Sequence, residues 1–276
     1  MTSDGKQILV TGGTGKTGKR VAERLRERHL PVRVASRKGE PPFDWSDRST
    51  WVPALDGVDA VYLSYYPDLV VPGAIEDIEA FSALAVRHGV RRLVLLSGRG
   101  EEEAEACEQV VRRVGTSSTI LRCSWFAQNF SEHFLLDAVL SGEVAMPAGE
   151  VTEPFIDADD IADIAVKALT SPAHNGELYE LTGPRLLTFA DAAEEIAAAS
   201  GRDVRYVPVS AEEYAAAAAG YGVPEEEVAA LTELFARVLD GRNSSVSEDV
   251  ERVLGRKATD FAEFARKAAA SGVWNR

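Results

Sequence analysis

The sequence predicts an α/β fold, a Rossmann-type doubly wound parallel sheet with a smaller, mostly C-terminal α/β substrate lobe. Short apolar runs alternate with amphipathic helical segments over residues 8–122, a rhythm that favours a parallel sheet. A glycine-rich turn at 12–18 joins the first apolar run to the first helical segment, the context that a dinucleotide fingerprint requires. We expect residues 1–142, with parts of 151–182, to form the NAD(P)-binding domain. Residues 143–276 would form most of the smaller lobe, integral with the first domain.

The first elements are a buried strand at 8–10 and an amphipathic helix that includes 19–25. Between them, residues 13–18 match G-x-G-x-x-G. Glycines here permit a sharp turn, a close approach of backbone N–H groups to a pyrophosphate, and tight packing of the helix on the strand. The helix N-terminus favours the anion. The expected pyrophosphate contacts are Gly12, Thr14, Gly15, Lys16, Thr17 and Gly18.

This turn has two other interpretations. Gly15-Lys16-Thr17 resembles the end of a P-loop, but Val10 stands where that motif needs a glycine, so the turn is too short to wrap a triphosphate. A tight turn that binds nothing is the other alternative. The strand–turn–helix context at the N-terminus favours binding.

A second strand at 31–37 ends about 20 residues past the glycines, where an acid would bind the ribose 2′-hydroxyl of NAD. Ser36 and Arg37 stand there instead, and a hydroxyl and a guanidinium suit a 2′-phosphate. The sequence therefore predicts NADP(H) as the preferred cofactor, with NAD(H) as the alternative. A solvated loop charge is the alternative explanation of Arg37. A stub of a third strand carrying Asp44 and Trp45 would lie beside the second strand and border an adenine.

The alternation continues through a short helix at 49–55, a strand at 58–64, a helix at 72–89, a strand at 90–97, a helix at 101–115 and a strand at 118–122. Parallel strands end at one sheet edge, where ligands bind. Ser64, Tyr65 and Ser97 are therefore expected beside the cofactor. Tyr65 and Tyr66 are the candidate proton donors, and Tyr66 is also a candidate wall for a planar substrate. Loop packing explains these two rings equally well.

Composition argues against several classes of protein. The net charge of -14, from 30 basic and 44 acidic residues, disfavours a nucleic acid or an anionic membrane as partner. Two cysteines are too few for a disulfide framework and indicate a cytoplasmic protein. No apolar run approaches the ~18–20 residues that cross a bilayer. The scattered histidines predict no metal site.

The second half adds further short elements. Residues 125–140 begin as a loop and become a helix, and a helix at 161–169 would be capped by Asp159 or Asp160. The remaining predicted elements are strands at 144–147, 154–157, 176–182 and 204–209, a helix at 189–199 capped by Thr188, a helix capped by Ser210, and helices at 225–239 and 260–270. The C-terminal helices could serve as a lid or as a homodimer face, and the sequence does not separate these uses.

These motifs together resemble the NmrA-like, atypical short-chain dehydrogenase/reductase family over nearly the whole chain. The segment at 10–18 is shared by many dinucleotide folds, whereas ILRCSWFAQNF at 120–130 and PFIDADDIA at 154–162 are more specific. The resemblance implies one of two functions. Some members are NAD(P)H-dependent reductases of quinones, dyes or aromatic polyketides, and others are redox sensors that bind cofactor and a protein partner without turnover.

One departure concerns the Tyr-x-x-x-Lys pair, with which typical short-chain reductases protonate a carbonyl oxygen. The corresponding helical segment at 101–109 has neither residue type. Quinone reduction depends less on this pair, because the reduced anion is delocalised and takes a proton from water. The expected substrate contacts are Tyr66, Trp125, Phe126, Asn129 and Phe130, and Cys123, Ser124 and Trp125 are expected beside the nicotinamide. A helix cap for Asn129 and core packing for Phe130 are the alternatives.

The sequence therefore predicts an NADPH-dependent reductase that transfers a hydride to a quinone or a similar planar conjugated carbonyl. The family resemblance extends this to an aromatic polyketide intermediate of secondary metabolism, with a partner oxygenase acting on the product. The alternative function is an NADP(H)-binding redox sensor of NmrA type without turnover.

Overall fold

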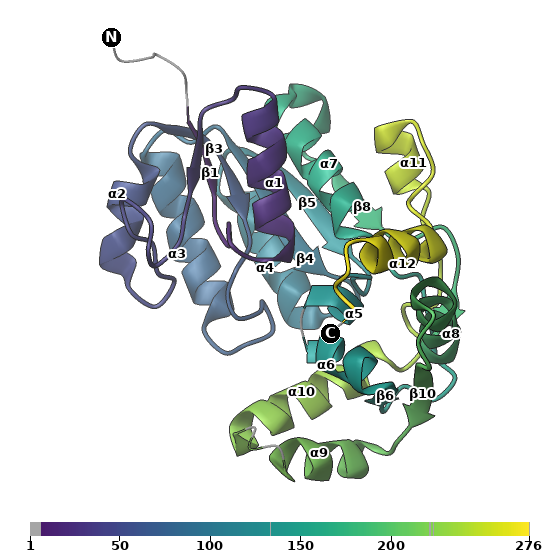
Figure 1. Ribbon diagram of the computed structural model, residues 1–276. Coiled ribbons are helices and arrows are strands. Elements are labelled where there is room, and N and C mark those ends of the chain that lie inside the picture. The colour runs from purple at the N-terminus through teal and green to yellow at the C-terminus, as the bar shows by residue number, and fades with distance from the viewer. Residues whose placement is uncertain (1–6, 133, 221, 223, 276) are drawn as a thin grey trace. The chain divides into compact units, whose positions relative to one another are not determined.

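The computed structural model describes residues 7–132, 134–220, 222 and 224–275. The chain divides into two compact units (Figure 1). Unit 1 comprises the chain up to Cys123 with Ala158–Leu181 and Asp249–Gly255, and unit 2 comprises Ser124–Asp157, Thr182–Glu248 and Arg256–Arg276. The sequence predicts the first domain boundary near residue 142, whereas the first boundary between the two units lies after residue 123.

Unit 1 is built on a parallel sheet. In the described part of the chain this sheet has six strands in the order β2-β1-β3-β4-β5-β8. The strands are β1 (Gln7–Val10), β2 (Val32–Val34), β3 (Val58–Leu63), β4 (Arg92–Gly98), β5 (Ser117–Cys123) and β8 (Leu178–Leu181). The predicted Rossmann-type sheet is confirmed. The strand order reverses between β1 and β3, and in such sheets ligands bind where the carboxyl ends of these strands meet.

Helices cover both faces of this sheet. Helix α1 (Lys16–Glu27) lies beside α7 (Ala158–Thr170) on one face, and α3 (Ala74–Arg87) lies beside α4 (Glu102–Arg113) on the other (Figure 1). Shorter elements of this unit are η1 (Arg48–Thr50), α2 (Trp51–Leu55), η2 (Pro172–His174) and α11 (Asp249–Leu254). Because both faces are covered, β3 to β5 are buried along most of their length instead of alternating between buried and exposed residues.

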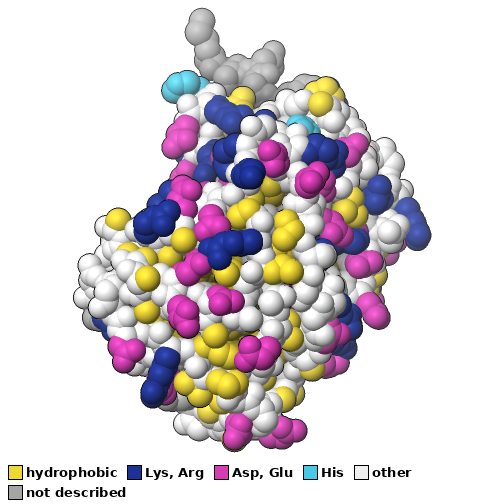
Figure 2. Space-filling model, turned by 90° about the vertical axis from the view of Figure 1, so that its right-hand side faces the viewer, with side chains coloured by type: hydrophobic (Ala, Val, Ile, Leu, Met, Phe, Trp, Pro, Cys, Tyr) yellow, Lys and Arg dark blue, Asp and Glu magenta, His cyan; other side chains and the backbone are white. Residues whose placement is uncertain are grey.

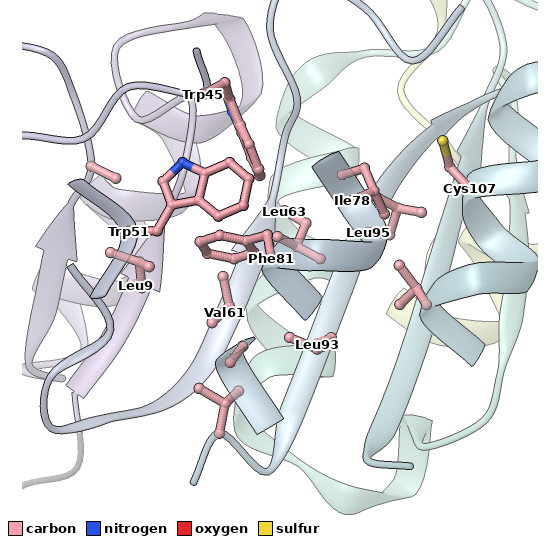
Figure 3. Close-up of a cluster of buried hydrophobic side chains, with 14 of the residues drawn as sticks. Leu9, Trp45, Trp51, Val61, Leu63, Ile78, Phe81, Leu93, Leu95 and Cys107 are labelled. Carbon is pink, nitrogen blue, oxygen red and sulfur yellow. The ribbon is translucent and has the colours of Figure 1, made fainter. Parts of the chain in front are cut away.

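An aromatic cluster fills the core between the sheet and α3. Trp45 and Trp51 both pack edge-to-face on Phe81, with ring centroids 5.0 and 5.5 Å apart (Figure 3). The predicted third-strand stub is wrong, because only an isolated bridge between Asp44 and Asp47 forms there. Preceding prolines cannot donate to a strand ladder, and the segment folds as turns whose buried rings join this cluster.

Ion pairs between α1 and α7 account for the acidic segment at the start of α7. Arg24 binds Asp159 at 2.7 Å and Asp163 at 2.6 Å. The prediction that Asp159 or Asp160 caps this helix is wrong, because α7 begins at Ala158 and both residues lie in its first turn. Asp159 and Asp163 therefore join the two helices through Arg24.

Unit 2 has a second core of phenylalanine rings, which include Phe130, Phe155, Phe189 and Phe261. Its helices are α5 (Asn129–Glu132), α6 (Phe134–Ser141), α8 (Phe189–Ser200), α9 (Ala211–Gly220), α10 (Glu225–Val238) and α12 (Phe261–Ala270). Strand β6 (Glu143–Met146) pairs with β10 (Arg205–Pro208), and β7 (Thr152–Glu153) with β9 (Leu187–Thr188). The predicted caps Thr188 and Ser210 are confirmed by bonds from backbone N–H groups three residues on.

Charged side chains of both signs are interspersed on the face drawn in Figure 2. In the part of the chain that the structure describes, no helix combines the length and the apolar character that a membrane crossing needs.

Candidate functional site

The glycine-rich turn between β1 and α1 is a closely packed loop. Gly12 has φ +59°, a conformation that favours glycine, and its carbonyl oxygen accepts a hydrogen bond from the Gly15 N–H at 2.9 Å. A Cβ on Gly18 would lie 2.3 Å from that same carbonyl oxygen, and a Cβ on Gly13 would lie 2.4 Å from Cγ1 of Val34. Side chains at these positions would displace the loop backbone or β2.

The N-terminus of α1 suits an anion. Gly15 is its N-cap and supplies no side-chain capping bond, and the first turn contains no acidic residue. The first N–H groups of any helix lack intrahelical partners, so a phosphate can bind them. Thr14 and Gly15 are exposed, whereas Thr17 is 3% exposed and would act through its backbone. The loop therefore fits a dinucleotide pyrophosphate.

Thr11 holds the two central strand ends together, a role that sequence reasoning missed. Its hydroxyl donates to the carbonyl oxygen of Tyr62 at 3.0 Å and accepts from the backbone N–H of Ser64 at 2.8 Å. The side chain is buried. The sequence feature that could have revealed this role is a threonine placed between an apolar strand and a glycine turn. Through Thr11, Ser64 is positioned beside the glycine loop.

Four of the predicted cofactor and substrate residues gather at the end of β2. The Arg37 guanidinium lies 5.9 Å from the ring centroid of Tyr66, which is 66% exposed. Asp44 accepts bonds from the backbone and hydroxyl of Ser46, which lower its pKa, and the charge of Arg37 lowers it further. Ser36 precedes Arg37 and is half-buried. This end of the sheet can therefore present a cation and an exposed ring to a nucleotide.

Trp45 lies apart from that group. It is 7% exposed, packs in the aromatic cluster and donates from its indole N–H to the carbonyl oxygen of Ser64 at 3.3 Å. The sequence predicts Trp45 beside an adenine, whereas in the structure the residue lies mainly in the hydrophobic core, below the ends of the strands.

The Tyr65 hydroxyl is poorly suited to donate a proton to a substrate. It donates to Asp77 at 2.9 Å, and Arg48 binds the same carboxylate at 2.8 Å. Burial, and then the hydrogen bond to Asp77, raise the pKa of Tyr65 above its ordinary value. Of the two candidate proton donors, only Tyr66 is exposed at this edge.

Buried polar groups lie at the ends of β4 and β5. The hydroxyl of Ser97 donates to Glu108 at 2.7 Å, and the guanidinium of Arg122 binds the same carboxylate at 2.9 and 2.5 Å. Glu108 is fully buried, and sequence reasoning missed it. Burial raises the pKa of the Cys123 thiol, which is therefore neutral. Ser97 and Cys123 therefore lie at the edge of the sheet as uncharged groups that determine its shape.

The remaining predicted residues belong to unit 2. Ser124 donates to the carbonyl oxygen of Pro154 at 2.5 Å, and the Trp125 ring packs on Phe189 with centroids 5.5 Å apart. Phe130 is fully buried, in agreement with the core alternative. Phe126 and Asn129 are half-buried and stay predicted substrate contacts.

The NmrA-like family model matches residues 4–265 of the chain. The chain belongs to the NmrA-like family. Among its relatives, the NAD(P)H azoreductase of Xenophilus azovorans is 35% identical over 96% of this chain and 98% of that protein. The agroclavine dehydrogenase of Claviceps fusiformis is 32% identical over 93% and 95%.

Solved structures share the fold of this NmrA-like protein at lower identity. The NADPH-dependent quinone oxidoreductase of Escherichia coli, complexed with NADPH, has a TM-score of 0.80 at 22% identity and covers 94% of this chain and 99% of its own. The triphenylmethane reductase of Citrobacter sp. has a TM-score of 0.76 at 21% identity, covering 96% and 99%. The predicted family and fold class are confirmed.

Proposed function

We propose that this NmrA-like protein is an NADPH-dependent reductase that transfers a hydride to a quinone or a similar planar conjugated acceptor. The observation that carries the proposal is the arrangement at one sheet edge. A glycine loop opens a helix with no acid in its first turn, and β2 leads to an exposed arginine instead of an acid. Both features suit the phosphates of NADP(H).

The relatives support the reductase class and the cofactor. A relative at 35% identity is named an NAD(P)H azoreductase, and others are named dehydrogenases. An azo group and a quinone are both planar conjugated acceptors, which agrees with the exposed ring of Tyr66. An aromatic polyketide as the natural acceptor, and an oxygenase that acts on the product, are the finer proposals that the family resemblance adds.

Each part of the edge has a distinct task. The loop from Gly12 to Gly18 holds the pyrophosphate, and Ser36 with Arg37 holds the 2′-phosphate. When bound, the reduced nicotinamide supplies the hydride. Ser64, Ser97 and Cys123 shape its side of the edge, while the exposed ring of Tyr66 orients the acceptor.

The first test is oxidation of NADPH, followed by its near-UV absorbance, against a panel of quinones and azo dyes with NADH run beside it. Saturable turnover is expected. NADPH binding without oxidation by any acceptor would contradict the proposal and favour the sensor function.

The Arg37→Asp variant tests the 2′-phosphate contact. We expect the KM for NADPH to rise at least about tenfold, because a hydrogen bond to a charged group contributes about 1.5–3 kcal/mol. The KM for NADH should change little. Lys38→Asp, the same charge reversal on the next exposed residue, is the control. Equal losses in both variants, or with both cofactors, would refute a specific contact and leave only general charge attraction.

A further inference from the structure

Glu101 occupies an unexpected place at the end of β4. The residue precedes α4, yet its side chain folds back over the strand end. A Cβ on Gly98 would lie 2.0 Å from its Oε2 and 2.2 Å from its Cδ. Gly98 pairs in register with Cys123 at the end of β5, and the next N–H along, that of Arg99, donates to the carbonyl oxygen of Cys123 at 3.0 Å. The carboxyl group therefore lies at the carboxyl edge of two central strands.

Helix capping does not explain this position. Glu101 is the N-cap of α4, but its side chain makes no capping hydrogen bond. The acidic first turn of α4, which includes Glu102 and Glu105, already complements the helix dipole. A side chain that only served the helix would turn toward these N–H groups and not toward Gly98.

The surroundings keep this carboxyl group protonated. It is half-buried, and the carboxylates of Asp68 after β3 and of Glu103 and Glu108 on α4 lie near it. The neutral thiol of Cys123 is a further neighbour. Burial first, and then these negative charges, raise the pKa of Glu101 to about 8. At neutral pH the group is therefore mostly an acid with a proton to donate. The cations of this region are Arg99, paired with Glu180, and Arg122, paired with Glu108.

We propose that Glu101 is the proton donor of the reduction, in the role that the missing Tyr-x-x-x-Lys pair fills in typical short-chain reductases. This inference rests on the proposed function. As the hydride from the cofactor reaches one acceptor atom, the conjugate atom gains the electron pair. The O–H bond of Glu101 breaks, and its proton forms an N–H or O–H bond on that atom. The resulting carboxylate takes a proton back from water, so each turnover consumes one NADPH and one proton.

The test compares Glu101→Gln with Glu102→Gln, which makes the same change on an exposed neighbour. With saturating NADPH, kcat of the Glu101 variant should fall about 100-fold with an azo dye, whose hydride adduct is strongly basic, and about tenfold with a quinone. The wild-type kcat should decrease as pH rises through about 8, and the variant should lose this dependence. NADPH affinity, measured by fluorescence, should change less than about threefold, since Glu101 does not bind the phosphates.

Infrared difference spectra of the protein without cofactor give a readout independent of turnover. Above pH 7 ordinary carboxyl groups are ionised, but burial raises the pKa of Asp68 as well as that of Glu101. A protonated carboxyl signal that disappears near pH 8 is therefore assigned to Glu101 by its absence from the Glu101→Gln variant. If that signal is missing, or if the variant keeps the wild-type rates and pH profile, the assignment of Glu101 is overturned while the reductase stands. A wild-type protein that turns over no acceptor overturns the proposed function and this role with it.

Discussion

Replacing Gly18 with alanine is expected to weaken NADPH binding at least about 100-fold. The new Cβ would lie 2.3 Å from the carbonyl oxygen of Gly12, 2.7 Å from its carbonyl carbon and 2.9 Å from Cα of Gly13. All three atoms are backbone, so the loop itself must move. Losing two charge-assisted bonds to phosphate, at about 1.5–3 kcal/mol each, accounts for the expected decrease in affinity.

Isothermal titration with NADPH measures this effect. Gly220→Ala is the matched control, because nothing lies within 4 Å of a Cβ there, and its affinity should equal that of the wild type. Gly18→Ala binding within about threefold of wild type would mean that NADPH binding does not depend on the backbone of this turn, and would refute its assignment as the pyrophosphate site.

The sheet and the glycine turn were predictable because their signals are local. An apolar run, a glycine turn and an amphipathic helix lie within about twenty residues of sequence, and each follows from backbone geometry. The position of Trp45, in contrast, does not follow from its sequence neighbours. It is determined by rings at 51, 65 and 81, which are brought together only by the folded sheet and α3.

The acidic segment before and within α4 combines exposed and buried carboxylates. A solvated face describes Glu102 and Glu105, which are exposed. Glu108, however, shares the buried stripe of Ala104, Cys107 and Val111 at helical spacing. A charged residue on an apolar stripe signals a buried partner. The direction of the Glu101 side chain carries no such signal, because it depends on space left open above Gly98.

Replacing Glu108 with alanine is expected to destabilise the protein by about 3–5 kcal/mol, the usual effect of removing one partner of a buried ion pair. The Glu108 side chain is 0% exposed and that of Arg122 is 16% exposed. Its removal leaves the guanidinium without its closest counter-charge and the Ser97 hydroxyl without its acceptor. The shift in the urea midpoint, at unchanged slope, measures the loss.

The Glu105→Ala variant separates the effect of burial on stability from the effect of charge alone. This residue lies on the same helix and carries the same charge, and its carboxylate is 3.7 Å from the same guanidinium, but its side chain is 49% exposed. Exposed pairs contribute about 0–1 kcal/mol, so this variant should unfold close to the wild-type midpoint. Equal midpoints for both variants would mean that Glu105 and Glu180 replace the lost carboxylate. A large difference would mean that Glu108 fixes the ends of β4 and β5, on which the proposed positions of Ser97 and Glu101 depend.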